Sequence, residues 1–430
     1  MRFHSRSFIA MLLLVAAVLT CALPGVPAQV NNAATAVVQT MQALVPSTPV
    51  ASPAPSTSPG SATTNTPAPQ ATASPSAATP SATSPTSSNP LPHSLYFLNN
   101  DTGGLLQIYR LERDGHTVHQ ITFEPAAVET YDISPKDGSV VYASNNQMLL
   151  VDANGAGRRL LLDGGPLDDN NRYTNGVGMP IWSPDGQTIA FNHGGLNFYS
   201  VSTGAVNRVL ENQIDTSSGF AVVRQLYAPV RYSPDGSKLL VSIGFYEGGT
   251  YAIYVPSNNT LLPFKRSDGA NVCCQADWVP DGSGLYASSS TIGMIDSGLW
   301  YLNPSDGSVA TLLVGSAPDG TYNFAAAPQV GTDGKLYFFF NNLPAIPSNG
   351  HTPLVLVRSG SDGVTGREQL KTDVFNNTNE ILWAPDASLA IVTFAPTQDV
   401  YQGGQAEVVF PDTRPNILLV PFAEQLHWGP

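Results

Sequence analysis

The sequence predicts an all-β fold built from repeated four-stranded units, and three features of the chain support this prediction. A short phrase recurs at intervals of roughly 50 residues: an aromatic residue, then Ser-Pro-Asp-Gly or a variant of it. A short apolar strand follows each phrase. Further along each unit comes a polar turn such as Asp114-Gly115 or Thr203-Gly204. Repeats of this length, each rich in short strands, are typical of the blades of a β-propeller.

The recurring phrase marks the turn between the first and second strands of each unit. Pro fixes the second turn position, Asp tolerates the third, and Gly supplies a left-handed residue, which predicts a type I hairpin turn with a bulge. The copies begin at Trp182, Tyr232 and Trp278, with fainter ones at Ile133, Val330 and Trp383 and a truncated one at Trp428. We expect the large residue at the start of each phrase to be buried between blades. This assigns a packing role to Trp182, Tyr232, Trp278, Trp383 and Trp428.

The segments between the phrases supply the remaining strands of each unit. Second strands are expected at residues 139–143, 188–191, 238–243, 284–288, 335–340 and 389–394. Fourth strands are expected at residues such as 158–162 and 309–314. Four antiparallel strands joined by tight turns form one blade.

The two ends of the repeated region complement each other. Residues 94–98 match a second strand, and residues 107–111 and 118–123 match a third and a fourth. The last phrase follows an inner strand at residues 424–428. We expect this strand to complete the unit begun by residues 94–123, which closes the ring and removes an open sheet edge. The count predicts a seven-bladed β-propeller, with six blades as the alternative if the weak copy at Val330 forms no blade of its own.

The N-terminal residues 1–28 are expected to be an export signal. A basic start precedes an apolar run at residues 8–19, which is shorter than the ~20 residues of a membrane span. Small residues at 26–28 offer a cleavage site. The alternatives are lipid modification of Cys21, directly after the apolar run, and an uncleaved anchor.

Residues 29–92 are expected to be a disordered linker, and residues 93–430 the propeller. Most of the linker is Pro, Ser, Thr and Ala, so it lacks the apolar side chains that would offset the entropy of ordering. A domain held on such a stalk behind an export signal is expected to be secreted or attached to the cell envelope.

The composition argues against several functions. The formal net charge is −13, only 12% of the residues are charged, and the 19 Lys and Arg residues are scattered. Without a basic stripe to neutralise phosphates we expect no nucleic-acid partner, and membrane attachment only through an N-terminal lipid anchor. No Gly-x-Ser-x-Gly elbow marks a serine hydrolase. Each carboxylate of a turn phrase is explained by turn chemistry, so neither a metal site nor a cofactor is expected.

The turn phrase and the strands around it resemble the TolB-like propeller repeat. The resemblance rests on [Trp/Tyr]-Ser-Pro-Asp-Gly, on a strand such as Lys238-Leu239-Leu240-Val241 and on one such as Arg158-Arg159-Leu160. It covers nearly all of residues 93–430, and the Gly-His and Trp-Asp dipeptides of WD repeats are missing. Proteins with this repeat include periplasmic scaffolds and the non-catalytic propellers of prolyl-oligopeptidase-like peptidases. The resemblance therefore implies the fold but no particular activity.

Candidate binding residues lie in and beside the long connections that lead from one unit to the next. They supply aromatic rings, Arg, amides and carboxylates to what we expect to be one face of the ring, a mixture suited to a sugar or a protein edge. The candidates are Glu129, Tyr131, Asp169, Arg172, Tyr173, Arg224, Tyr227, Cys273, Cys274, Tyr322, Asn377 and Glu380.

The adjacent Cys273 and Cys274 are a distinct feature of this set. The third cysteine, Cys21, lies in the expected signal. In an oxidising compartment two neighbouring thiols can close a strained vicinal disulfide, and strained features often mark functional sites. Reduced buried thiols and intermolecular pairing are the alternatives.

These observations predict an exported, non-enzymatic binding propeller that recognises a protein or glycan partner through the face formed by the connections between blades. One alternative is a lyase or hydrolase of carbohydrates that uses Glu129, Asp169 or Glu380 together with Arg172 or Tyr173. It would require two of these carboxylates to lie about 5–10 Å apart. The other alternative is a structural domain of the cell surface. The oligomeric state does not follow from the sequence.

Overall fold

The computed structural model describes residues 89–168, 172–217, 221–246, 248–272, 274–292, 296–348 and 350–430. These residues belong to one compact unit, Ser84–Pro430. The expected export signal with Cys21, almost all of the expected linker and the candidates Asp169 and Cys273 lie outside the described residues.

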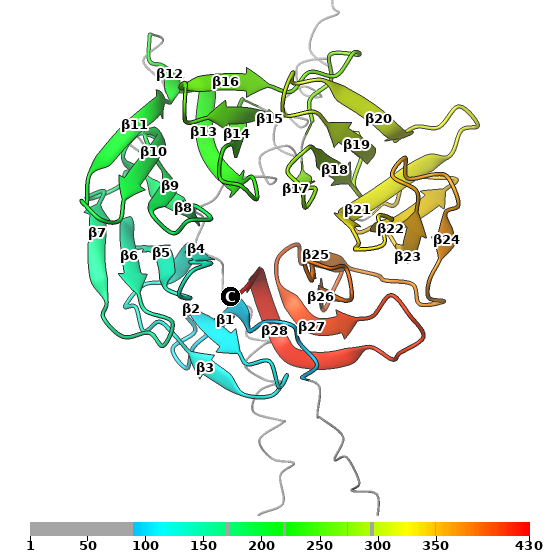
Figure 1. The fold of residues 1–430 in the computed structure, drawn as a ribbon, viewed down its shortest axis with the longest axis horizontal. Coiled ribbons are helices and arrows are strands. Elements are labelled where there is room, and N and C mark those ends of the chain that lie inside the picture. The colour runs from blue at the N-terminus through cyan, green and yellow to red at the C-terminus, as the bar shows by residue number, and fades with distance from the viewer. Residues whose placement is uncertain are drawn as a thin grey trace, which may run out of the picture. The chain divides into compact units, whose positions relative to one another are not determined.

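The described residues form antiparallel sheets arranged around a ring (Figure 1). Within each sheet, most hydrogen-bonded neighbours follow one another in the sequence, so the sheets are meanders. One short helix, α3 (Arg172–Asn175), lies in a connection between two sheets. The prediction of an all-β fold is confirmed, and the arrangement is that of a β-propeller.

Five sheets contain four or five strands each. The first contains β4 (Val128–Ile133), β5 (Val140–Ser144), β6 (Gln147–Val151) and β7 (Arg159–Asp163). The second contains β8 (Val177–Trp182), β9 (Thr188–His193), β10 (Gly195–Ser200) and β11 (Val206–Glu211). The third contains β12 (Gln213–Asp215), β13 (Val222–Tyr232), β14 (Leu239–Phe245), β15 (Gly248–Val255) and β16 (Thr260–Pro263). The fourth contains β17 (Gln275–Trp278), β18 (Leu285–Ser289), β19 (Gly298–Leu302) and β20 (Val309–Val314). The fifth contains β21 (Tyr322–Val330), β22 (Leu336–Leu343), β23 (Val355–Ser359) and β24 (Glu368–Gln369).

The sixth sheet joins segments from the two ends of the described chain. Its order is β25 (Thr378–Trp383), β26 (Ala390–Phe394), β27 (Gly404–Val409), β28 (Ile417–Trp428), β1 (Leu95–Asn100), β2 (Leu106–Leu111) and β3 (Val118–Gln120). Between Ile417 and Ala423, β28 pairs with β27. Its remaining residues pair with β1, with Trp428 opposite Leu95 and Glu424 opposite Leu98. The pairing that the sequence predicted between these two segments is therefore present.

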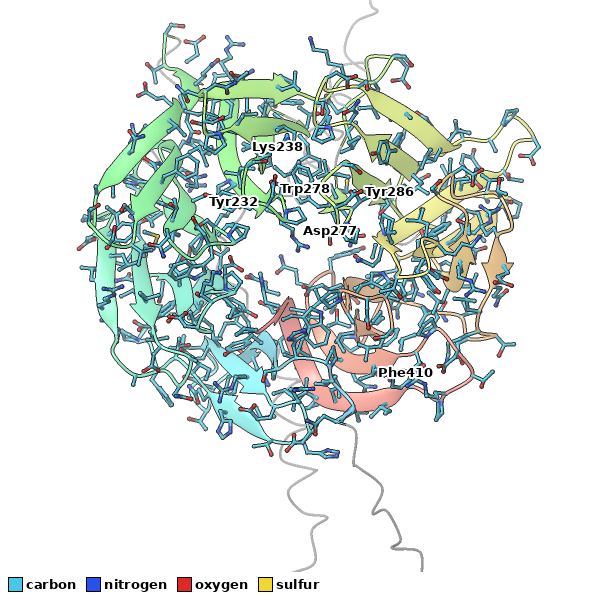
Figure 2. The ribbon with its side chains drawn as sticks, in the orientation of Figure 1. Tyr232, Lys238, Asp277, Trp278, Tyr286 and Phe410 are labelled. Carbon is cyan, nitrogen blue, oxygen red and sulfur yellow. The ribbon has the colours of Figure 1, made fainter. Side chains whose placement is uncertain are left out.

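Each residue that was predicted to begin a turn phrase is the last residue of a strand. The seven strands concerned are β4, β8, β13, β17, β21, β25 and β28. On neighbouring sheets, Tyr232 and Trp278 lie toward the centre of the ring (Figure 2). Four of the five predicted packing residues are buried, whereas Trp428 is only partly buried and packs against a core cluster.

The turns after these strands have the predicted chemistry. Gly186 and Gly236 are left-handed, with φ values of 69° and 73°. The Oδ1 atom of Asp185 accepts hydrogen bonds from the Ser183 hydroxyl (2.6 Å) and from the Gln187 N–H (3.0 Å). These contacts confirm that turn chemistry explains this aspartate.

The predicted strand at residues 118–123 is wrong at its C-terminal end. β3 stops at Gln120. Beyond it, the Thr122 hydroxyl accepts the N–H of Ile108 (2.8 Å), so a side chain takes the place of a backbone carbonyl in the ladder. The predicted strand at residues 335–340 is also too short, because β22 continues to Leu343.

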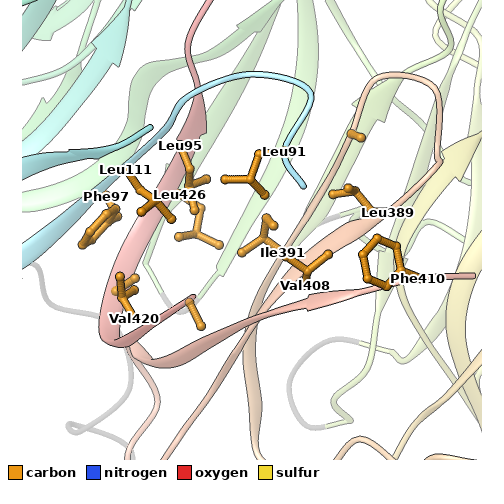
Figure 3. Close-up of a cluster of buried hydrophobic side chains, with 13 residues drawn as sticks. Leu91, Leu95, Phe97, Leu111, Leu389, Ile391, Val408, Phe410, Val420 and Leu426 are labelled. Atoms are coloured by element: carbon orange, nitrogen blue, oxygen red, sulfur yellow. The ribbon is translucent and has the colours of Figure 1, made fainter. Parts of the chain in front are cut away.

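The apolar core is divided into clusters of buried side chains. One cluster contains Leu95 and Phe97 from β1, Ile391 from β26, and Val420 and Leu426 from β28 (Figure 3). Side-chain packing thus adds to the strand pairing that joins the two ends of the described chain. Among the described residues, no helix has both the length and the apolar character that a membrane span needs.

Candidate functional site

The two faces of the ring are built from different kinds of connection. In an antiparallel meander, alternate connections lie at opposite ends of the sheet. One face therefore carries the Ser-Pro-Asp-Gly-type turns and the Asp-Gly-type turns, and we call it the turn face. The other carries the hairpins between second and third strands and the connections from sheet to sheet, and we call it the loop face.

A cavity of about 500 Å³ lies on the loop face beside the first four-stranded sheet. The turn between β5 and β6, the connection after β7 and one residue of β4 contribute to it. Its lining residues are Glu129, Asn145, Asn146, Gln147, Asp163, Gly165, Pro166 and Leu167. Among the described residues, this lining contains two carboxylates, three amides and no cationic side chain. Such a set suits a ligand that carries hydroxyl or amino groups.

Hydrogen bonds hold the amide wall of the cavity in place. Asn145 and Asn146 both adopt left-handed φ values, 50° and 57°, and form the turn between β5 and β6. The Asn146 side chain accepts the N–H of Val177 (2.7 Å) and donates to the carbonyl of Gly165 (2.8 Å). One buried amide thus ties the hairpin to the connection that follows β7.

The carboxylate of Asp163 is also bound within the wall. It accepts hydrogen bonds from the Gln147 amide (3.2 Å) and from the N–H of Gly165 (2.9 Å). Neither Asp163 nor the Asn145–Gln147 turn was among the predicted site residues. The Asn-Asn pair was a usable signal, because two successive residues that tolerate left-handed φ favour a two-residue hairpin.

Among the described residues of the predicted set, Glu129 is the member that lines this cavity. It lies at a shift in register of β4, between Val128 and Thr130. The residue is exposed, and its carboxylate forms no hydrogen bond or ion pair with the described residues. The surrounding protein still desolvates this carboxylate, which raises its pKa above the ordinary glutamate value. Glu129 is therefore a carboxyl that a ligand could engage.

Arg172 and Tyr173 lie in α3, further along the connection that follows the cavity lining. The side-chain amide of Asn212 donates to the carbonyl of Tyr173 (2.8 Å) and so ties α3 to the next connection. Neither residue lines the cavity.

Tyr131 and Tyr227 are core residues. Tyr131 is 2% exposed, and its hydroxyl donates to the backbone carbonyl of Gln425. Burial raises the pKa of Tyr131 well above that of a free tyrosine. Tyr227 is 5% exposed, and its hydroxyl donates to the Gln225 side chain. The structure places both rings inside the propeller.

Three other predicted residues are distributed over separate connections. Arg224 is exposed and forms an ion pair with Asp215 (2.8 Å). Tyr322 begins β21 and is partly buried in a core cluster. Asn377 is left-handed, with a φ of 54°, and its carbonyl accepts the N–H of Ala395 (2.8 Å). None of the three lines the cavity.

Glu380 lies on the inner strand β25. Its Oε1 atom accepts the N–H of Leu426 (2.6 Å). It does not line the cavity that contains Glu129, where Asp163 is the second carboxylate. Within the described residues, no three His, Cys, Asp or Glu side chains gather in an arrangement that could hold a metal ion.

Cys274 is disulfide-bonded. Its φ of 110° lies in a region that residues with a side chain rarely adopt, and its carbonyl accepts the hydroxyl of Tyr251 (3.0 Å). The bond overturns the alternative of a reduced thiol for this residue. Because Cys273 lies outside the described residues, the vicinal pairing stays a prediction.

Large apolar side chains in the connections are exposed mainly on the loop face. Phe123, Tyr246 and Tyr401 are 76%, 74% and 60% exposed. Together with these rings, the exposed large apolar residues of the loop-face connections in the described chain are Leu167, Ile346 and Val374. The described turn-face connections contribute Val364. The loop face therefore exposes more large apolar side chains than the turn face does.

Comparison with known proteins gives structural neighbours but no sequence relative. No protein-family model and no curated protein matches the chain. TolB from Acinetobacter baumannii shares 13% identity over 77% of this chain and 81% of its own, with a TM-score of 0.39. A putative TolB from Agrobacterium tumefaciens shares 16% over 71% and 98%, with a TM-score of 0.40. An oligogalacturonate lyase in complex with manganese shares 10% over 76% and 85%, with a TM-score of 0.47.

TolB-like β-propeller proteins are thus among the solved structures that this chain resembles. The likeness is too distant to carry any statement about activity, ligand or partner. What the chain itself defines is a β-propeller with one plain face and one face that holds a polar cavity and exposed aromatic side chains.

Proposed function

We propose that the chain is an exported, non-enzymatic binding propeller that recognises a protein partner through its loop face. The observation that carries the proposal is the gathering of exposed large apolar side chains on that face, including Phe123, Tyr246 and Tyr401. Aromatic residues are enriched at protein interfaces because a rigid ring offers a large contact area at a low cost in entropy. The turn face offers no comparable surface within the described chain.

The ring that supports this face is proposed to have seven blades. Seven strands of the described chain end at the residue that begins a turn phrase. The two halves of β28 pair with different neighbours, β27 and β1. The seven-stranded sheet then divides into two four-stranded blades that share β28, and this strand closes the ring. Export by residues 1–28 and tethering by residues 29–92 belong to the same proposal.

The cavity gives the proposed partner a chemical character. The described part of its lining contains the carboxylates of Glu129 and Asp163 and no cationic side chain. A Lys or Arg side chain of the partner would form a charge-assisted hydrogen bond with Glu129, which contributes about 1.5–3 kcal/mol. The formal net charge of −13 also attracts a basic partner over a longer range. We therefore propose a partner that presents a basic side chain flanked by apolar residues.

Binding of the full chain to arrays of immobilised peptides and of glycans tests this proposal. We expect binding to peptides that carry Lys or Arg among apolar residues, weakening as salt is added. Glu129→Gln should reduce the affinity about tenfold, the effect of losing one charge-assisted hydrogen bond. Val364→Ser on the turn face is the matched control and should leave binding unchanged. Binding to glycans alone, or binding that is insensitive both to Glu129→Gln and to Phe123→Ser, would reject the proposal.

A carbohydrate-active hydrolase is the second candidate. Two carboxyls, Glu129 and Asp163, share one cavity, and the pKa of Glu129 is raised by burial. A carboxyl with a raised pKa beside a second carboxyl is the arrangement that glycosidases use. Release of reducing ends from an oligosaccharide panel, abolished in both Glu129→Gln and Asp163→Asn, would favour this candidate. The cavity and the uneven loops do not favour a purely structural domain.

A further inference from the structure

The last five residues of β28, Glu424 to Trp428, form a junction that we call the closing segment. They pair with β1 on one side. The backbone N–H of Leu426 donates to Glu380 of β25 (2.6 Å). The side-chain amide of Gln425 donates to the carbonyl of Glu129 on β4 (2.7 Å). Three strands from distant parts of the chain therefore hold this segment.

The ladder between the closing segment and β1 is irregular. His427 lies opposite Tyr96 and Glu424 opposite Leu98, so two residues on β28 face one on β1 and the register shifts. Gln425 adopts a left-handed φ of 53° at this shift. Such a bulge leaves ladder groups unpaired, and two contacts compensate for part of that loss: the N–H of Leu426 donates to Glu380, and the carbonyl of Gln425 accepts the hydroxyl of Tyr131. The closing segment thus depends on side chains more than a regular strand does.

The side chains around the closing segment are mostly acidic. Glu380 and Glu424 are both partly buried, and no Lys or Arg of the described chain forms an ion pair with either. Within the closing segment, His427 is the only residue whose side chain can carry a positive charge. Its Nδ1 atom lies 3.4 Å from Asp132 Oδ1. The titratable groups that face this end of β28 are Glu380 from β25, Glu129, Tyr131 and Asp132 from β4, Tyr96 from β1, and His93 just before β1, whose ring centroid lies 6.4 Å from that of Trp428.

The environment of Glu424 disfavours its charged form. Burial, and then the neighbouring carboxylate of Glu380, raise the pKa of Glu424 to about 7. Burial also raises the pKa of Glu380, although the N–H of Leu426 opposes this shift by donating to its carboxylate. A second negative charge at this place therefore becomes costly when the pH rises above neutrality.

We propose that the closing segment is a proton-sensitive latch, held against β1, β4 and β25 while Glu424 is protonated and loosened when Glu424 ionises beside Glu380. Because the bulge at Gln425 interrupts the ladder with β1, this segment is the part of β28 that we expect to open. The latch goes beyond the proposed binding function and does not depend on the nature of the partner.

Proton linkage sets the direction of the effect. The pKa of Glu424 is higher in the folded chain than in the unfolded chain, where it has the ordinary glutamate value. The folded state therefore binds more protons than the unfolded state between about pH 4.5 and pH 7. The contribution of Glu424 to the free energy of unfolding is complete below this window and is lost as the pH rises through about 7.

Amide hydrogen exchange of the full chain, read by mass spectrometry between pH 5 and pH 8.5 and corrected for intrinsic rates, tests the latch. Peptides that cover residues 417–430 and 94–100 should lose about tenfold in protection above pH 7, while the central strand β5 should not. Glu424→Gln should remove this pH dependence. Glu380→Gln keeps the acceptor for Leu426 and should reduce the dependence. Glu211→Gln is the matched control, because Glu211 is highly exposed on β11.

The proposal is overturned if the closing segment has the same protection at pH 6 and pH 8, or if Glu424→Gln retains the pH dependence of the original chain. His427→Gln tests the remaining ionisable contact of the segment, the pair that His427 forms with Asp132. Loss of the pH dependence in His427→Gln alone, with Glu424→Gln unchanged, would assign the effect to the histidine and reject the latch. If Glu424→Gln does not fold, the reduced dependence in Glu380→Gln carries the same decision.

Discussion

The turn face and the loop face of this propeller are ends of the same strands, yet they differ in construction. On the turn face, Asp185 accepts hydrogen bonds from its own neighbours and Gly186 supplies the left-handed residue. On the loop face, the connections differ in length from unit to unit and expose rings such as Phe123 and Tyr246. One face is determined by local turn chemistry, and the other is free to vary.

This difference indicates where function can be placed on a repeated fold. Residues that complete a turn or fill the space between sheets stabilise the fold, so few substitutions are tolerated there. The exposed side chains of the loop face contribute little to folding, so they can vary for recognition. Each region should therefore respond to substitution in its own way.

The largest effect is expected at a packing residue of the inner strands. Trp278 is 7% exposed within a core cluster, so Trp278→Ala should lower the free energy of unfolding by about 3–5 kcal/mol. Denaturant titration followed by fluorescence or circular dichroism measures this change. A decrease in the free energy of unfolding below about 1 kcal/mol would mean that the ring does not depend on the packing residues that end the inner strands.

An intermediate effect is expected on the turn face. Asp185→Ala removes the acceptor of two hydrogen bonds and should lower the free energy of unfolding by about 0.5–1.5 kcal/mol at neutral pH. The hydroxyl of Ser183 is the main cause of the lowered pKa of Asp185 in the folded chain. The stabilising effect is therefore present above the ordinary aspartate pKa and is lost as the pH falls through the lowered value. Denaturant titrations at pH 7 and near pH 3 should show the difference between the two proteins shrinking in acid. A constant difference would contradict this account of the turn.

The smallest effect on stability is expected on the loop face. Tyr246 is 74% exposed, so Tyr246→Ser should change the free energy of unfolding by less than about 0.5 kcal/mol. Thermal unfolding of the variant beside the original chain checks this. A loss comparable to that of Trp278→Ala would break the division between the two faces.

Asp185 and Glu424 make the same contrast in their response to pH. The pKa of Asp185 is lowered by hydrogen bonds to its charged form, whereas the pKa of Glu424 is raised by burial and by Glu380. Acid should therefore weaken the turn face, and alkali should weaken the closing segment. The closing segment is stabilised by a neutral carboxyl group, and the turn face is stabilised by a charged carboxylate.

Much of the fold could be predicted because the repeat carries local chemistry. Trp182, Tyr232 and Trp383 could be assigned to strand ends from the Pro and Asp that follow them, since those residues specify a turn wherever they occur. The end of β3 could not be placed, because the Thr122 hydroxyl that replaces a backbone acceptor is recognisable only when its partner on β2 is known.

The candidate site was less predictable. Position in or beside a connection between sheets selected Glu129, which lines the cavity, but it did not distinguish Glu129 from Tyr131, two residues later and buried in the core. Regular alternation along β4 would point these two side chains to the same face, and the shift in register between Val128 and Thr130 changes that alternation. Asp163 joins the cavity from β7, the strand at the opposite edge of the same sheet, a proximity that depends on how the strands pair.

By itself, the order of the amino acids determined the repeat, the turns and the residues that end the inner strands, because each follows from interactions between near neighbours in the chain. The tertiary structure decided which carboxyls meet. Glu424 and Glu380 lie far apart in sequence and acquire linked protonation when β28 packs against β25, because burial and charge repulsion depend on distance in space.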